Sequence, residues 1–318
     1  MVDLAAVMSD SAVVHAEADH AVFTSLPSPT GEGYRLVAWS SGLKAEERAE
    51  ITRRAPSHGS LCGEGASAGA VSILNLRSSG RAAFGFTRVS GAEHTRRGGG
   101  RVWTDFVVLE AAEVSRAGLR PADVREALPK DRAARPGTAA LPRLQVSLAG
   151  GAPLTSDATG VAVAVAATLA DRRPSVIAVG KDGAALLCKA LGLLPASMRG
   201  GIEACGGLRF SRAREVVATI VDSIDQETIR STRGQGMECV DATRVSTAAS
   251  SGLAPWLRLM ARWCDEGRTE EAARLSDRLR AGWKLAEILE VAAVCEAIDR
   301  REERSETLDL LLSRRSAG

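Results

Sequence analysis

Residues 71–88 read VSILNLRSSGRAAFGFTR, and this stretch predicts a β-hairpin. Two apolar runs, Val71–Arg77 and Arg81–Arg88, flank Ser78-Ser79-Gly80, where glycine suits the positive φ that a tight turn requires. Other runs near this hairpin share its strand-forming composition: Ala21–Leu26, Tyr34–Trp39 and Val102–Leu109. Residues 1–135 are therefore expected to form a β-rich N-terminal domain of the α+β class.

Two helices are predicted among these strands. Lys44–Arg54 carries Glu46 and Glu47 near its start, and carboxylates there are favoured by the helix dipole. Pro121–Leu128 reads as a short helix with proline in its first turn. The stretch Lys130–Thr138, which contains arginine, proline and glycine, predicts a linker after the first domain.

Residues 136–246 are expected to form an α/β middle domain. In the apolar run Thr159–Ala170 the valines alternate at first, as in a strand, but the length and alanine content favour a buried helix. Val176–Val179 and Val216–Val221 predict buried strands, and a helix through Leu187 and Leu191 lies between them. This alternation of strands and helices is typical of an α/β layer.

Residues 247–318 are predicted to form a small C-terminal helical bundle. Apolar residues at the spacing of one helix face occur at Leu253, Trp256, Leu257, Met260, Ala261 and Cys264. Thr269 is expected to cap a second helix, and shorter stripes follow at Leu285–Cys295 and Leu308–Leu312. The ten basic and eleven acidic residues from position 268 onward suit solvated outer faces. The alternative is a surface that docks a partner's helix.

Composition argues against several classes of protein. The chain has 41 basic and 39 acidic residues and only 3% aromatic residues, so neither excess charge nor stacking rings favour nucleic acid as a partner. The longest uncharged apolar run has 12 residues, against about 20 for a membrane span, and no signal peptide is recognisable. Six cysteines without CxxC spacing indicate reduced thiols. A cytoplasmic protein without a membrane segment is expected.

The most suggestive local motif lies between residues 93 and 103. Three arginines, Arg96, Arg97 and Arg101, surround Gly98, Gly99 and Gly100, and His94 precedes them. Backbone N–H groups of consecutive glycines and arginine forks both bind anions, so an anion-binding or partner-binding loop is one interpretation. The motif lacks the spacing of a P-loop. A solvated loop with a tight turn is the other interpretation.

Other candidate sites are weaker. His58 and Cys62 lie in a Ser/Gly-rich turn, and an imidazole can activate a thiol, but no third residue is recognisable as orienting the ring. Val179–Gly183 lies between a strand and a helix, where α/β proteins bind phosphates, yet it lacks the glycine spacing of a nucleotide loop. The four histidines show no metal-ligand spacing. No catalytic residue, metal or cofactor is therefore assigned.

The N-terminal motifs also resemble a known family. Val22–Ser25, Gly33–Ser40, the Gly80-Arg81 hairpin and Arg96–Thr104 are together similar to the N-terminal domain of the bacterial GTPase-associated protein one family. Residues 174–211 resemble, more loosely, the middle domain of that family. The resemblance implies an adaptor encoded with a GTPase in a conflict or signalling system. At the position where the family tends to have histidine, this chain has Asp105.

Two functional hypotheses follow. The first is a non-enzymatic adaptor or scaffold that binds protein partners, with a GTPase among the candidates. The second is a phosphate-handling or hydrolytic enzyme that uses the Arg/Gly loop together with His58 or His94. A general base needs an orienting partner, and the sequence names none. The first hypothesis is preferred for that reason, while an enzymatic activity stays open.

Overall fold

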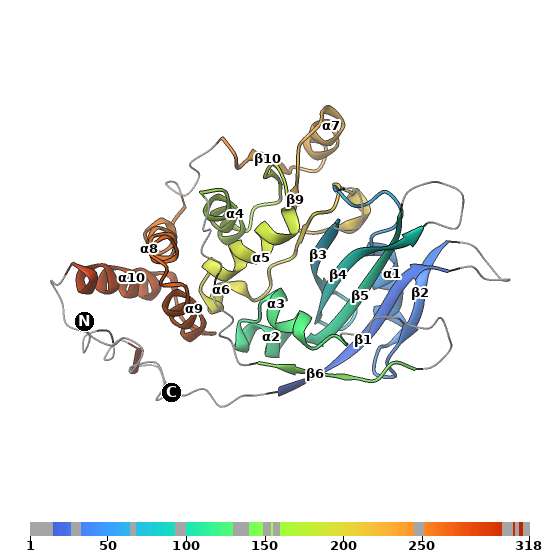
Figure 1. Ribbon diagram of the computed structural model, residues 1–318, viewed down its shortest axis with the longest axis horizontal. Coiled ribbons are helices and arrows are strands. Elements are labelled where there is room, and N and C mark those ends of the chain that lie inside the picture. The colour runs from blue at the N-terminus through green and yellow to red at the C-terminus, as the bar shows by residue number, and fades with distance from the viewer. Residues whose placement is uncertain are drawn as a thin grey trace.

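The fold is built on a mixed sheet of ten strands. The computed structural model describes residues 15–26, 33–63, 68–92, 100–129, 140–148, 154, 160–244, 251–300, 308, 312 and 313. Within them the strand order is β10-β7-β9-β8-β3-β4-β5-β1-β2, and β6 pairs with β1 outside this path. Figure 1 shows the sheet with helices packed beside it and a group of C-terminal helices at one end.

One part of the sheet is antiparallel and includes the predicted hairpin. Its strands are β1 His15–Ser25, β2 Tyr34–Trp39, β3 Gly69–Leu76, β4 Arg81–Ala92 and β5 Gly100–Glu110. Leu76 pairs with Arg81, and Gly80 has the expected positive φ of 71°. All five strand segments predicted in the N-terminal region are confirmed, because alternating apolar residues mark a strand locally.

The other part of the sheet is parallel. Its strands are β7 Ser175–Ala178, β8 Ala204–Gly206, β9 Ala218–Val221 and β10 Glu238–Asp241. They pair in the order β10-β7-β9-β8, each parallel to its neighbour. The α/β character predicted for the middle region is therefore present.

The two parts share hydrogen bonds across the predicted boundary near residue 135. β3 pairs with β8, with Val71 opposite Gly206 and Ile73 opposite Ala204. In addition β6, Leu144–Ser147, pairs with β1. A single sheet with parallel and antiparallel strands therefore connects residues assigned to the first and second predicted domains. The division at residues 135 and 246 stays a prediction.

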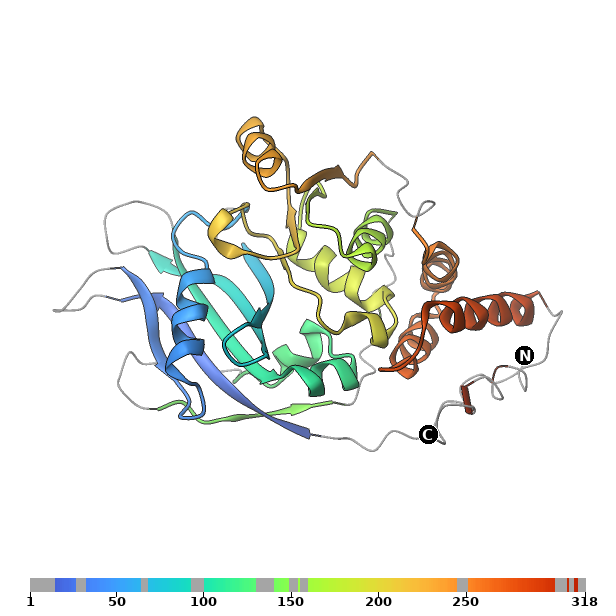
Figure 2. The same cartoon turned by 180° about the vertical axis from the view of Figure 1, so that it is seen from behind.

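Helices cover both faces of the sheet. α1 Ala45–Arg54 lies on the face seen in Figure 2 and buries Ile51 against Phe106 and neighbouring residues. The opposite face carries α2 Ala111–Ala117, α3 Pro121–Glu126, α4 Gly160–Asp171, α5 Gly183–Leu193 and α6 Ala196–Arg199. α4 confirms that the apolar run Thr159–Ala170 is a buried helix rather than a strand. The predicted linker Lys130–Thr138 lies outside the described residues.

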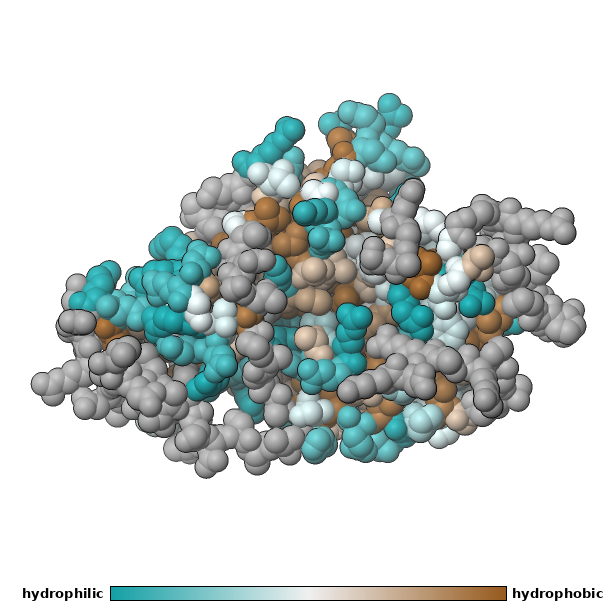
Figure 3. Space-filling model, viewed as in Figure 1, coloured by the Kyte–Doolittle hydropathy of each residue, from teal (hydrophilic) through white to brown (hydrophobic). Residues whose placement is uncertain are grey.

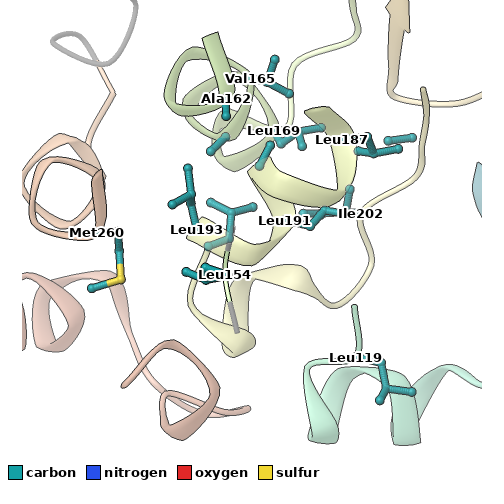
Figure 4. Close-up of a cluster of buried hydrophobic side chains, with 14 of the residues drawn as sticks. Leu119, Leu154, Ala162, Val165, Leu169, Leu187, Leu191, Leu193, Ile202 and Met260 are labelled. Atoms are coloured by element: carbon teal, nitrogen blue, oxygen red, sulfur yellow. The ribbon is translucent and has the colours of Figure 1, made fainter. Parts of the chain in front are cut away.

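The C-terminal helices pack on the middle region. They are α8 Ala254–Asp265, α9 Thr269–Arg278 and α10 Leu285–Asp299. Figure 4 shows Met260 of α8 near Leu193, beside the side chains that α4 and α5 contribute to the same apolar cluster. Trp256 is fully buried, and its Nε1 donates to the Leu193 carbonyl at 2.8 Å.

This packing limits what the tail can offer a partner. The predicted apolar stripe of α8 is occupied by the protein's own core, so it is not a docking surface. Figure 3 shows mostly hydrophilic residues over the end of the molecule that these helices form, as expected for solvated outer faces. Thr269 is the first residue of α9, and Arg268 occupies the N-cap position, so the predicted cap was wrong by one residue.

Buried arginines also connect the three regions. The Arg199 guanidinium in α6 donates to Asp277 of α9 at 2.6 Å and to the Gly118 carbonyl at 2.9 Å. Arg54 of α1 donates to Glu203, which precedes β8, at 2.8 Å. Removing one partner of such a buried pair leaves an uncompensated charge, which costs about 3–5 kcal/mol. These contacts therefore oppose separation of the regions.

Candidate functional site

The predicted Arg/Gly loop belongs to the connection between β4 and β5. His94, Arg96, Arg97, Gly98 and Gly99 lie outside the described residues, whereas Gly100 and Arg101 begin β5. The half-buried Arg101 donates from Nε to the Ser90 carbonyl at 2.9 Å. Within the described residues, no ion pair involves its remaining guanidinium nitrogens.

Gly100 is required by local packing. It pairs with Ala92 where the register between β4 and β5 shifts after Val89. A Cβ placed on Gly100 would lie 2.4 Å from Cγ1 of Val89, far inside contact distance. Local packing therefore explains why residue 100 is a glycine, without reference to any ligand.

Two side chains hold the base of this hairpin. The Val102 N–H donates to the Tyr34 hydroxyl at 3.0 Å, and Thr24 Oγ1 donates to the Val102 carbonyl at 2.7 Å. The β1–β5 register ends with Thr24 opposite Trp103, so these side chains satisfy backbone groups just beyond the ladder. The loop therefore starts from a well-anchored strand end.

A polar row that the sequence did not reveal crosses β4, β5 and β1. Arg88 stacks over the Trp103 ring at 5.4 Å, and Trp103 Nε1 donates to Asp105 at 3.2 Å. The other oxygen of Asp105 lies 3.2 Å from His20 Nε2, and both residues are buried. Asp105 thus contacts a histidine that comes from another strand. Cross-strand neighbours such as these cannot be identified before the register is known.

The described residues do not support His58 and Cys62 as a nucleophilic pair. Burial raises the pKa of the Cys62 thiol, and the Asp222 charge acts in the same direction, so the thiolate required for attack is disfavoured. Nδ1 of His58 has no hydrogen-bond partner within the described residues, so nothing there orients the ring as a base. No hydrogen bond or ion pair in that part of the chain joins His58 to Arg101.

Two adjoining cavities lie at the carboxyl ends of β8 and β9. Their volumes are about 560 and 450 Å³, and Cys62 and Asp222 line both. The predicted turn Val179–Gly183 contributes Asp182 and Gly183 to the larger cavity. The sequence located this turn but missed Asp222, which follows the predicted strand Val216–Val221 and carried no motif of its own. We call the two cavities together the switch cleft.

The described residues contain no group of three or more His, Cys, Asp or Glu side chains arranged to hold a metal ion. None of their helices combines the length and apolar character that crossing a membrane requires.

Comparison with known proteins identifies a family match in the N-terminal part of the chain. Residues 17–146 match the family model described as GTPase-associated protein 1, N-terminal domain type 2. The predicted resemblance is confirmed for this part, which includes the β4–β5 hairpin and the His20–Asp105 pair. The looser resemblance over residues 174–211 falls outside the matched residues and stays a prediction. No curated protein and no solved structure matched the chain.

Proposed function

We propose that this chain, whose residues 17–146 match the GTPase-associated protein 1 N-terminal domain of type 2, is a non-enzymatic adaptor in a bacterial GTPase-linked conflict or signalling system. Its partners would be cytoplasmic proteins, a GTPase among them. The family match carries this proposal, because the family is named for its association with a GTPase. The division into three functional regions belongs to the same proposal.

The pKa values of the thiols and the surroundings of the histidines support an adaptor over an enzyme. Burial raises the pKa of the Cys188 and Cys264 thiols to about 11 and that of Cys295 to about 12. His20 is buried against Asp105, and His58 lacks an orienting partner in the described part. A nucleophile poised for catalysis needs a lowered pKa, and a general base must be both oriented and accessible. Asp105 orients His20, but burial keeps that ring away from a substrate.

The β4–β5 hairpin is the surface we assign to partner binding. Its base is held by Tyr34 and Thr24, and its connection carries Arg96, Arg97 and Arg101. Arginine forks form charge-assisted hydrogen bonds with carboxylates, so an acidic surface of the partner is the complementary chemistry. Because solvated arginines contribute little to stability, such a surface can be removed without unfolding the protein.

Replacing Arg96, Arg97 and Arg101 together with alanine tests this assignment. Each charge-assisted hydrogen bond contributes about 1.5–3 kcal/mol, so affinity for a GTPase partner should fall at least roughly tenfold. The binding of wild type and variant to that GTPase, GTP and polyphosphate would be measured by calorimetry. A matched control replaces three exposed arginines elsewhere: Arg173, Arg212 and Arg258.

The outcomes separate the two functional hypotheses. Loss of GTPase binding alone supports the adaptor. Loss of nucleotide or polyphosphate binding instead supports the phosphate-handling enzyme that uses the Arg/Gly loop with His58 or His94. Unchanged binding of all three, or equal loss in the control variant, would show that the hairpin is not the binding surface.

A further inference from the structure

We infer that the switch cleft binds a small phosphorylated molecule with free hydroxyl groups, of the nucleoside monophosphate class. The larger cavity would hold the phosphate and the smaller one the hydroxyl-bearing part. This site borders the β4–β5 hairpin, because Phe86, Thr87 and Arg88 of β4 line its larger cavity, but it does not rest on the adaptor proposal. The position of the cleft, its two ends and its volume support the assignment.

The position is one where parallel sheets bind ligands. β7 connects through α5 toward β8, whereas β9 connects through α7, Gln226–Arg233, toward β10 on the other side of β7. The connections that leave the neighbouring strands β7 and β9 therefore run in opposite directions. Ligands of open α/β sheets bind outside the carboxyl ends of strands at such a switch point.

The larger cavity has cationic groups for a phosphate. Arg88 and Arg125 line it, and Arg125 is exposed without an ion pair in the described part of the chain. Gly183, Ala184 and Ala185, the first turn of α5, line the same cavity. Their N–H groups precede the first intrahelical bond, and the Asp182 side chain does not cap them. Asp182 and Asp222 also line this cavity and limit its positive potential.

The smaller cavity has the chemistry of a hydroxyl-binding site. Asp222 and Glu227 offer carboxylate oxygens that accept hydrogen bonds, and Ser223 and Ser231 offer hydroxyl groups. Phe210 adds an aromatic ring against which a planar base can pack. Arg209 lies on the same wall, with its Nε directed to the Leu61 carbonyl at 3.3 Å.

Each of the two cavities is large enough to hold one part of such a ligand. Each cavity, about 560 and 450 Å³, falls within the roughly 300–1,000 Å³ typical of small-molecule sites. Asp222 borders both cavities. A ligand with its phosphate in the larger cavity and its hydroxyl groups in the smaller one would therefore pass beside Asp222. Phe86 of β4 and Gly183 of α5 line the larger cavity together, so the ligand would contact both parts of the sheet.

Calorimetry on the full chain tests this inference with five probes. These are adenosine monophosphate, guanosine monophosphate, ribose 5-phosphate, adenosine and inorganic phosphate. We expect saturable binding of at least one nucleotide, with ribose 5-phosphate weaker and with adenosine and inorganic phosphate each weaker by about tenfold or more.

Two substitutions in α5 and its cap probe the phosphate end without removing a buried group. Ala185→Glu places a carboxylate in the first turn of a helix, where it favours folding but repels phosphate, so nucleotide affinity should fall about tenfold or more. Ala185→Gln, of the same size without charge, is the matched control and should bind nearly as wild type. Asp182→Asn removes a repelling carboxylate and should tighten binding severalfold.

Asp222→Asn probes the hydroxyl end and should weaken nucleotide binding. Because Asp222 also borders the phosphate cavity, the same change should not weaken the binding of inorganic phosphate. The inference is overturned if no probe shows saturable binding, or if adenosine or inorganic phosphate binds as tightly as the nucleotides. It is equally overturned if Ala185→Glu and Ala185→Gln have the same effect. Melting temperatures of each variant verify that the fold is intact. None of these results depends on GTPase binding, so failure here leaves the adaptor proposal to its own test.

Discussion

At the scale of single residues, Glu50 shows how one carboxylate organises a turn. It accepts hydrogen bonds from the backbone N–H groups of Arg77 at 3.1 Å and Ser78 at 3.3 Å, both in the β3–β4 turn. Arg54 donates to the same carboxylate at 3.2 Å. Burial raises the pKa of Glu50, but these hydrogen bonds outweigh burial and lower it below its ordinary value.

The pKa of Glu50 predicts how stability depends on pH. A lowered folded-state pKa means that the carboxylate stabilises the protein above the unfolded value of about 4.3, and that this contribution is lost as pH falls through the folded value. We expect Glu50→Gln to lower the free energy of unfolding by about 1–3 kcal/mol at pH 7, with a smaller difference near pH 3. Urea unfolding at both pH values measures this.

The control for this prediction is Glu290→Gln, which changes an exposed carboxylate on α10. It should alter stability by less than about 0.5 kcal/mol at either pH. A difference between wild type and Glu50→Gln that stays constant from pH 7 to pH 3 would contradict the assigned role.

At the scale of secondary-structure elements, α8 contributes to the core of the middle region. Trp256 and Leu257 are fully buried, and Trp256 is also hydrogen-bonded to the end of α5 through Leu193. From the sequence alone, the apolar stripe of α8 could have been a surface for a partner. In the structure it is already packed against the rest of the chain.

Trp256→Ala should consequently destabilise the protein strongly. Loss of a buried aromatic side chain costs about 3–5 kcal/mol through lost burial and the cavity left behind. Leu285→Ala is the control, because Leu285 is 44% exposed and should cost less than about 1 kcal/mol. Chemical denaturation followed by circular dichroism compares the two, and equal effects would show that the α8 face is not core.

At the scale of the whole molecule, contacts between distant segments hold the predicted regions together. The β3–β8 and β1–β6 pairings both join residues before position 130 to residues after position 140. The buried pairs of Arg54 with Glu203 and of Arg199 with Asp277 add contacts of the same kind.

These contacts predict that the chain stays assembled when it is cut. A specific protease site introduced within residues 130–138 should be cleaved, yet both fragments should elute together in size-exclusion chromatography and separate only in denaturant. The uncut protein with the same insertion is the control. Separate elution without denaturant would show that the regions are independent domains divided near residue 135.

Local patterns were enough to predict most elements. The hairpin Val71–Arg88 and the helix within Thr159–Ala170 were predicted from the spacing of apolar residues, the turn residues and the length of the apolar run. All three are properties of residues close together in the sequence. The motif series that resembles the GTPase-associated protein family is likewise readable along the chain, and the family match confirms it over residues 17–146.

Tertiary structure alone decided the rest. The pairing of β3 with β8 joins residues about 130 positions apart, and no periodicity in either segment specifies that partner. The stripe of α8 indicates a buried face, but only packing shows that Leu193 lies beneath it. The switch cleft unites Cys62, Arg125 and Asp222 from three distant segments. The sequence by itself determined which elements form, because their causes are local. Which elements meet was decided by long-range contacts.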